Sequence, residues 1–167
     1  MAALALARAG DTAQAQKLAE RLSKDLPQDT IVQGYWLPSI RAAIELNARD
    51  AAKAVEILQT AVPFELGKGD PFLVPMYPVH LRGQSYLLAH QGKEAAAEFQ
   101  KMIDHRGIVV NFPLGALTHL GLARAYALQG DPDKARAAYQ DFLTLWKNAD
   151  PDIPILKQAK EEYAKLQ

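Results

Sequence analysis

Four alanines recur at a nearly constant interval along this chain of 167 residues. Ala54, Ala95 and Ala135 each follow the preceding alanine of the series, which starts at Ala15, by about 40 residues. A repeat of this length is typical of stacked helical hairpins, each too small to bury its own apolar face and therefore packed against its neighbours. The spacing predicts an all-α array whose extended concave surface binds another molecule.

Composition favours a folded chain without a strong overall electrostatic field. Hydrophobic residues make up 49% of the sequence, and 19 Lys and Arg balance 19 Asp and Glu. Because no net charge draws in a phosphate backbone, we expect no nucleic acid partner. No apolar stretch approaches the roughly 18 to 20 residues of a membrane span, so we expect a soluble protein, with a cytoplasmic location favoured and an extracytoplasmic one open if a span precedes it. The sequence has no cysteine, which leaves the compartment open.

Helix start and stop signals divide the chain into four hairpin units and a final helix, which we expect to form a single domain over residues 1–167. The units are expected at about residues 1–27, 30–63, 75–105 and 113–148, with a capping helix at 152–166. Pro38 lies inside an expected helix and predicts a kink or a break at Leu37.

Three further boundaries follow from proline, glycine and the apolar start. We expect a helix to end at Val62 before Pro63, and irregular connectors from Phe64 to Val74 and from Arg106 to Phe112. The apolar segment from Met1 to Ala9 is typical of the second half of a helix. We therefore expect the chain to be the C-terminal part of a longer protein.

The third and fourth units share a pattern of large and small residues, with Gly or Ala at the expected helix contact. The third unit has Val79, Arg82, Gly83, Tyr86, Ala95 and Phe99, and the fourth has His119, Leu122, Ala123, Tyr126, Ala135 and Tyr139. Both units resemble the tetratricopeptide repeat, and the first two units are weaker versions of it. The resemblance implies a right-handed α-solenoid of about four hairpins plus a C-terminal capping helix.

Three segments carry a second resemblance: Tyr35-Trp36-Leu37-Pro38, Phe99 to Gly107 and Leu122 to Tyr126. Together they resemble the tetratricopeptide tails that follow the catalytic domain in a group of bacterial serine/threonine protein kinases. This resemblance implies a sensing or docking tail of a signalling protein. The chain itself has no glycine-rich phosphate loop, and Asp104-His105-Arg106 has the wrong order for a catalytic His-Arg-Asp, so we predict no enzymatic activity.

The tetratricopeptide resemblance also implies where a partner binds, because members of that family hold a peptide on the inner faces of the first helix of each hairpin. On this register the candidate binding residues are Trp36, Ser39, Asn47, Tyr77, His80, Gln84, Leu87, Leu120 and Arg124. Trp36 and Tyr77 are the strongest candidates, since large aromatic residues with a polar group are enriched at binding hot spots. Either of them could instead pack beneath the connector that follows Phe64.

The chemistry of these positions narrows the partner. Co-chaperone members of the family hold a C-terminal carboxylate with Lys and Asn, whereas the corresponding places here are Ser39/Ala43, His80/Gln84 and Leu120/Arg124. The resemblance therefore disfavours a ligand ending in Glu-Glu-Val-Asp. Leu, Tyr and a few neutral polar groups instead predict an extended or helical peptide, or a protein helix, with apolar anchors.

The sequence gives little basis for a metal or cofactor site. The four histidines are His80, His90, His105 and His119, and no two are three or four residues apart, so we expect no metal and no other cofactor.

The charge runs from Lys93 to Glu98 and from Lys157 to Glu162 are interpreted as solvated helix faces. An alternative to partner binding is self-association, in which the exposed apolar edge from Met1 to Ala9 pairs with a second copy to form a homodimer.

Overall fold

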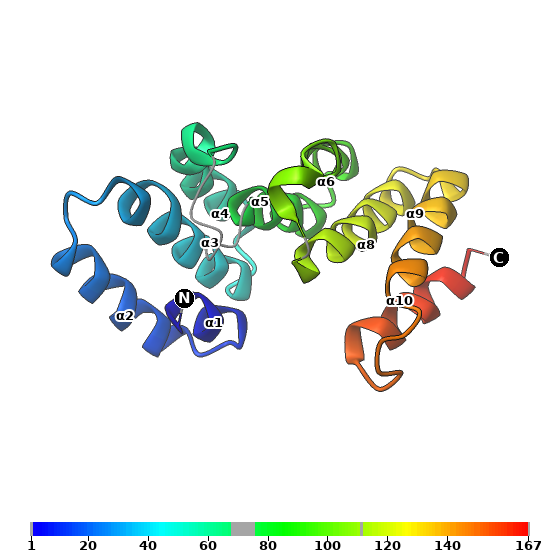
Figure 1. Cartoon of the computed structure of the whole chain (residues 1–167), viewed down its shortest axis with the longest axis horizontal. Helices are drawn as coiled ribbons and strands as arrows, with labels where there is room; N and C mark the ends of the chain where they lie inside the picture. Colours follow the sequence, from blue (N-terminus) through cyan, green and yellow to red (C-terminus); the bar gives the residue numbers. More distant parts are fainter. Residues whose placement is uncertain (1, 68–75, 111, 167) are drawn as a thin grey trace.

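The computed structural model describes residues 2–67, 76–110 and 112–166, and within these ranges the chain is helical without a strand (Figure 1). The predicted all-α class is confirmed. The α-helices are α1 (Ala2–Arg8), α2 (Thr12–Asp25), α3 (Leu37–Asn47), α4 (Ala51–Leu58), α5 (Tyr77–Leu88), α6 (Gly92–Asp104), α7 (Arg106–Val109), α8 (Pro113–Leu128), α9 (Pro132–Leu145) and α10 (Pro154–Ala164). A π-helix, η1 (Val32–Trp36), precedes α3, and a 3-10 helix, η2 (Gln59–Phe64), follows α4.

Consecutive helices pack in pairs, and each pair packs on the next. The pairs are α1 with α2, α3 with α4, α5 with α6 and α8 with α9, and contacts between α1 and α3, α3 and α5, and α5 and α8 link one pair to the next. The helices follow an arch in which α1 and α2 at one end and α10 at the other project to the same side (Figure 1).

The turn inside each pair has one repeated geometry. Gly10, Arg49, His90 and Gly130 all have positive φ, at 89°, 61°, 56° and 72°, and they recur with the same period as the alanines. After each of them, the next backbone N–H donates to a carbonyl five residues earlier, as from Asp11 N to Leu6 O at 3.0 Å. This is the Schellman arrangement, which satisfies the last carbonyls of a helix.

The residue after each of these positions is the N-cap of the next helix. The carboxylates of Asp11, Asp50 and Asp131 each accept a hydrogen bond from the backbone N–H three residues later, at 3.1, 3.0 and 3.1 Å. In the third turn Gln91 takes this place without a side-chain cap. An aspartate at this position satisfies an otherwise unpaired donor of the helix, so three of the turns both end one helix and start the next.

Small residues let the helices approach closely, as the alanine spacing predicted. Ala15, Ala54, Ala95 and Ala135 are all 0% exposed. The ring of Phe99 on α6 lies against two glycines: a Cβ on Gly83 of α5 would be 2.7 Å from Phe99 Cζ, and one on Gly121 of α8 would be 2.5 Å away. Phe99 therefore joins its own pair to the next one through contacts that leave no room for a methyl group.

Several expected boundaries differ from the structure. Pro38 causes no break, because the chain is helical through η1 into α3, and the Leu37 N–H donates to Val32 O in a five-residue step just before the proline. Pro63 does not end the helical path either, since η2 continues through it to Phe64. The connector expected from Arg106 to Phe112 contains α7. Part of the connector expected from Phe64 to Val74, residues 68–74, lies outside the described residues.

Candidate functional site

The predicted binding residues lie at the end of η1 and along α3, α5 and α8, the first helices of three of the pairs. We call the side of α1, α3, α5 and α8 that carries Arg8, Asn47, Gln84 and Arg124 the inner face. Arg8 and Asn47 hold equivalent places in consecutive units, and so do Gln84 and Arg124, because each of these two pairs is separated by one repeat. Asn47 Nδ2 donates to the Ala7 carbonyl, which ties the end of α3 to the end of α1.

Four of the nine predicted residues are buried within the helix packing. Trp36, Ser39, His80 and Leu120 are each less than a tenth exposed. Ser39 Oγ donates to the Tyr35 carbonyl at 2.7 Å, and the Trp36 ring meets the Tyr35 ring edge-on with centroids 5.1 Å apart. A partner cannot touch these side chains in this structure, because the surrounding helices cover them.

The other five remain accessible. Asn47 is exposed, and Tyr77, Gln84, Leu87 and Arg124 are half-buried. The backbone N–H of Tyr77 donates to the Tyr35 hydroxyl at 3.0 Å, which fixes the start of α5 against η1. The inner face therefore offers an amide, a phenol, an apolar side chain and a guanidinium to a partner.

The structure adds Arg8 to this face, a residue that the sequence reasoning did not select. Arg8 Nη1 donates to Gln84 Oε1 at 2.8 Å, so a side chain from α1 reaches across to α5, the first helix of the third pair. The repeat spacing held a signal for Arg8, since it stands one repeat before the selected Asn47. It was missed because the first unit matches the tetratricopeptide pattern least.

His80 lies below this bridge as a neutral ring. Its side chain is 4% exposed, its Nδ1 has no hydrogen-bond partner in the described part of the chain, and its ring centroid is 5.8 Å from that of Phe99. Burial, and then the positive charge of Arg8, lower the pKa of His80 to about 3. Burial likewise raises the pKa of the Tyr77 hydroxyl, with the Arg8 charge acting in the opposite direction.

At the other end of the inner face, Arg124 is already paired. It makes a bidentate pair with Glu162 of α10, with Nε to Oε2 at 2.9 Å and Nη2 to Oε1 at 3.1 Å. The Tyr139 hydroxyl of α9 donates to the same carboxylate at 2.8 Å. The interpretation of Lys157 to Glu162 as a solvated face is therefore wrong at Glu162, whose carboxylate holds α10 against two other helices.

A buried ionic network lies between η2 and the third pair. The Arg82 guanidinium donates to Glu98 at 2.9 and 2.7 Å and also to Glu65, while Lys101 Nζ donates to Glu65 Oε2 at 2.6 Å. Burial lowers the pKa of Arg82, but hydrogen bonds to Glu98 and Glu65 outweigh it and raise the pKa overall.

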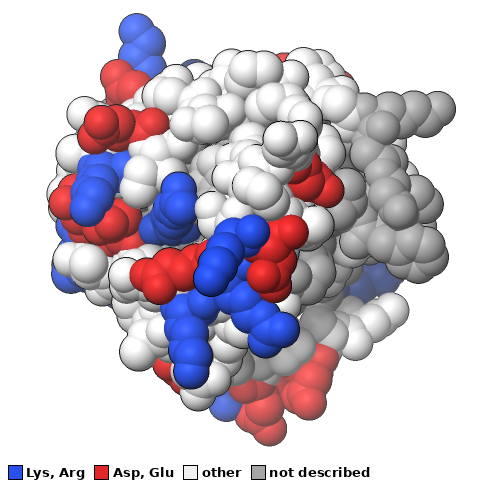
Figure 2. Space-filling model, turned by 90° about the vertical axis from the view of Figure 1, so that its left-hand side faces the viewer, with Lys and Arg blue, Asp and Glu red and all other residues white. Residues whose placement is uncertain are grey.

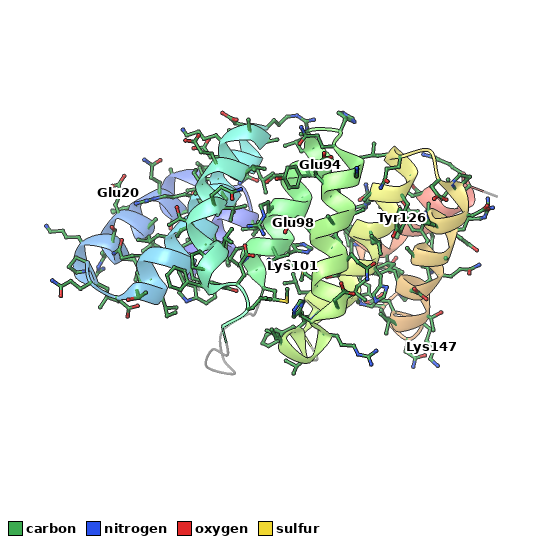
Figure 3. The ribbon with its side chains drawn as sticks, turned by 90° about the horizontal axis from the view of Figure 1, so that it is seen from above. Glu20, Glu94, Glu98, Lys101, Tyr126 and Lys147 are labelled. Atoms are coloured by element: carbon green, nitrogen blue, oxygen red, sulfur yellow. The ribbon has the colours of Figure 1, made fainter. Side chains whose placement is uncertain are left out.

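This network corrects a second charge run. Glu98 and Lys101 lie close to one another in Figure 3, and the Glu98 side chain is only 18% exposed. The solvated-face interpretation of Lys93 to Glu98 is therefore wrong at Glu98. The Glu65 side chain is fully buried, which anchors the start of the expected connector to α5 and α6.

A cavity of about 640 Å³ lies away from the predicted residues, between the ends of α6 and α9 and the start of α8. Its walls are mostly apolar and include Met102, Ile103, Phe112, Ala116, Leu145 and Trp146. Arg106 and His119 add polar groups, and His119 Nδ1 is 3.5 Å from Asp141 Oδ2.

Charge on the N-terminal end of the arch is mixed. Figure 2 shows Lys and Arg side chains interspersed with Asp and Glu on this end, beside an uncharged area. Arg21 pairs with Asp25 at 3.3 Å, and Lys53 pairs with Glu45 at 3.0 Å. Across the described ranges, no group of three or more His, Asp or Glu is arranged to hold a metal ion, and none of the helices there has the length and apolar character that a membrane crossing needs.

Comparison with known proteins finds similarity to bacterial proteins named as chaperones. No family model matches the sequence. Over 78 residues the chain is 41% identical to the protein described as "Chaperone protein YscY" in Yersinia enterocolitica, and equally so to the protein of that name in Yersinia pestis. The match covers 44% of this chain and 63% of each of those relatives. The similarity therefore spans less than half of this chain and less than two thirds of the relatives.

Proposed function

We propose that this chain is a chaperone-like, non-catalytic module that holds a segment of a partner protein against its inner face. The observation that carries the proposal is the 41% identity over 78 residues to proteins named as chaperones. The inner face supports it, because Tyr77, Gln84 and Leu87 are half-buried there and offer both apolar area and polar groups.

The proposal includes a tetratricopeptide-type solenoid that runs through the whole chain. Its support is the recurrence of one turn geometry in all four helix pairs at a constant period, together with packing of the first helix of each pair on the first helix of the next. A stack of this kind carries its binding surface along the inner side of the first helices. In this proposal α10 caps the stack, with its neighbour α9 and the Arg124–Glu162 pair holding it in place.

The relatives lend no support to the predicted kinase tail, so the proposal keeps partner binding and leaves out a sensing role. Self-association through the first helix also gains no support. Ala3, Leu4 and Ala7 of α1 are buried against the neighbouring helices, which leaves small side chains such as Ala2 and Ala5 on its exposed side. A homodimer stays a prediction of the sequence.

The test is site-specific photo-cross-linking in a lysate of the source organism. Benzoylphenylalanine replaces Tyr77 or Leu87 on the inner face, and control variants carry it at the exposed positions Glu20 of α2 and Glu94 of α6, both labelled in Figure 3. We expect a defined partner segment to be labelled from the inner-face positions and not from the controls. Equal labelling from Glu20 and Glu94, or none from Tyr77 and Leu87 in correctly folded variants, would reject the proposal.

A further inference from the structure

We propose that the inner face anchors its partner by binding an acidic side chain, with Arg8, Gln84 and Tyr77 supplying the hydrogen bonds. This inference rests on the proposed function, because it names the chemistry by which the same face recognises the partner segment. The predicted ligand is an amphipathic segment that presents Asp or Glu beside apolar residues.

Arg8, Gln84 and Tyr77 keep hydrogen-bond donors that no contact uses in the described part of the chain. Arg8 gives one N–H to Gln84 Oε1, and none of the ion pairs in the described part of the chain includes Arg8. Since Oε1 of Gln84 already accepts this bond, its amide nitrogen keeps two N–H groups, and the Tyr77 hydroxyl supplies another donor. A carboxylate matches such a set, because its two oxygens only accept and bind a guanidinium most strongly in a bidentate manner.

The surroundings favour an anion over a second cation. His80 is buried beside Arg8 with an unpartnered Nδ1, and its ring is neutral at pH 7, so Arg8 is the charged group at this place. Tyr77 packs against apolar clusters on both sides, those of the first two pairs and of the later ones. Tyr77 and Gln84 are half-buried whereas Arg8 is exposed, so a carboxylate bound here loses part of its water only when the partner covers the site, and it then interacts with Arg8 more strongly than in open water.

The molecule already contains one contact of this kind. Position 124 is the repeat equivalent of position 84, and there Arg124 binds the Glu162 carboxylate that α10 brings to α8 and α9. The Tyr139 hydroxyl adds a donor to that carboxylate. We infer that a partner helix uses the Arg8 end of the face in the same way, with its own acidic residue in the place of Glu162.

The experiment uses the segment that Tyr77 and Leu87 label, synthesised as a peptide with each Asp or Glu changed singly to Asn or Gln. Affinity for the full chain is measured by fluorescence anisotropy with wild type, Arg8→Gln, Arg8→Lys and a matched control, Arg41→Gln, at an exposed arginine of α3. We expect Arg8→Gln and one acidic-to-amide change each to weaken binding about tenfold or more, with no further loss when the two are combined. Arg8→Lys should recover part of the loss, because it keeps the charge without the planar fork.

A further readout separates the outcomes. A peptide with an amidated C-terminus should bind like the free acid, and loss on amidation would assign the contact to a terminal carboxylate and overturn the proposal. A segment that binds Arg8→Gln as tightly as wild type would reject this inference alone, whereas no labelled segment would reject the proposed function and this inference with it.

Discussion

Replacing Arg49 and His90 by glycine should stabilise this protein, because both occupy the left-handed turn position that Gly10 and Gly130 fill in the other two turns. Their φ angles are 61° and 56°, and both side chains are exposed. A side chain in this conformation costs about 1–2 kcal/mol. The greater freedom of glycine in the unfolded chain offsets about 0.5–1 kcal/mol of that.

The expected net gain is therefore centred on about 0.75 kcal/mol, within a range of about 0 to 1.5 kcal/mol, for Arg49→Gly and for His90→Gly. The two turns belong to different helix pairs, so their effects should add, and the double variant should gain about 1–2 kcal/mol. For a protein of this size that corresponds to a rise in melting temperature of roughly 2–8 °C. Circular dichroism melts and urea titrations of the single and double variants measure it.

A matched control stands one residue earlier in each turn. Ala48 and Ala89 have φ of −73° and −79°, so glycine there removes no strain and should lower stability by up to about 1 kcal/mol. If Arg49→Gly and His90→Gly lower the free energy of unfolding as much as these controls do, the strain assigned to the two turns is absent.

Three other perturbations test the packing and the buried charges. Gly121→Leu should destabilise by about 1–3 kcal/mol in denaturant titrations, because the added side chain meets the Phe99 ring, whereas Gly107→Ala, with nothing within 4 Å, should not. Arg82→Met removes the pairs of Arg82 with Glu98 and with buried Glu65, which keeps only Lys101, and should cost about 3–5 kcal/mol; an unchanged melt would refute the network. The pKa of His80 is about 3 in the folded chain, below the usual 6.5. Between these two pH values the unfolded chain therefore binds a proton at His80 that the folded chain does not bind. Stability should therefore fall as pH drops from about 6.5 to 3, and this loss should be smaller in His80→Leu.

Helix positions were predictable because local residues set them. The fourth unit was expected to begin at about residue 113, and α8 begins at Pro113, as a helix does when a proline takes its first position. Pro38 was predictable only as a disturbance. In the structure a π-helical turn stands where a break was expected, and its Tyr35 and Trp36 are buried in the helix packing, which a local pattern does not contain.

For the predicted binding residues, too, the sequence supplied part of the answer and the packing decided the rest. The repeat register selected Tyr77, Gln84 and Arg124, whose side chains are half-buried rather than covered. It also selected Trp36 and Ser39, which are covered, because a register gives the direction of a side chain and not what stands in front of it. Trp36→Ala would therefore remove buried contacts and cost about 3–5 kcal/mol, so it cannot serve as a test of binding alone.

The sequence by itself determined the all-α class, the constant repeat spacing and the alanines at which helices meet, since these follow from periodicity along a single chain. Only the tertiary structure decided which charges are paired and which side chains a partner can reach. Arg8 and Gln84 meet although 76 positions separate them, because the arch brings the first and third pairs together on its inner side. The Arg8–Gln84 contact therefore depends on how α1 packs on α3 and α3 on α5, rather than on any one segment.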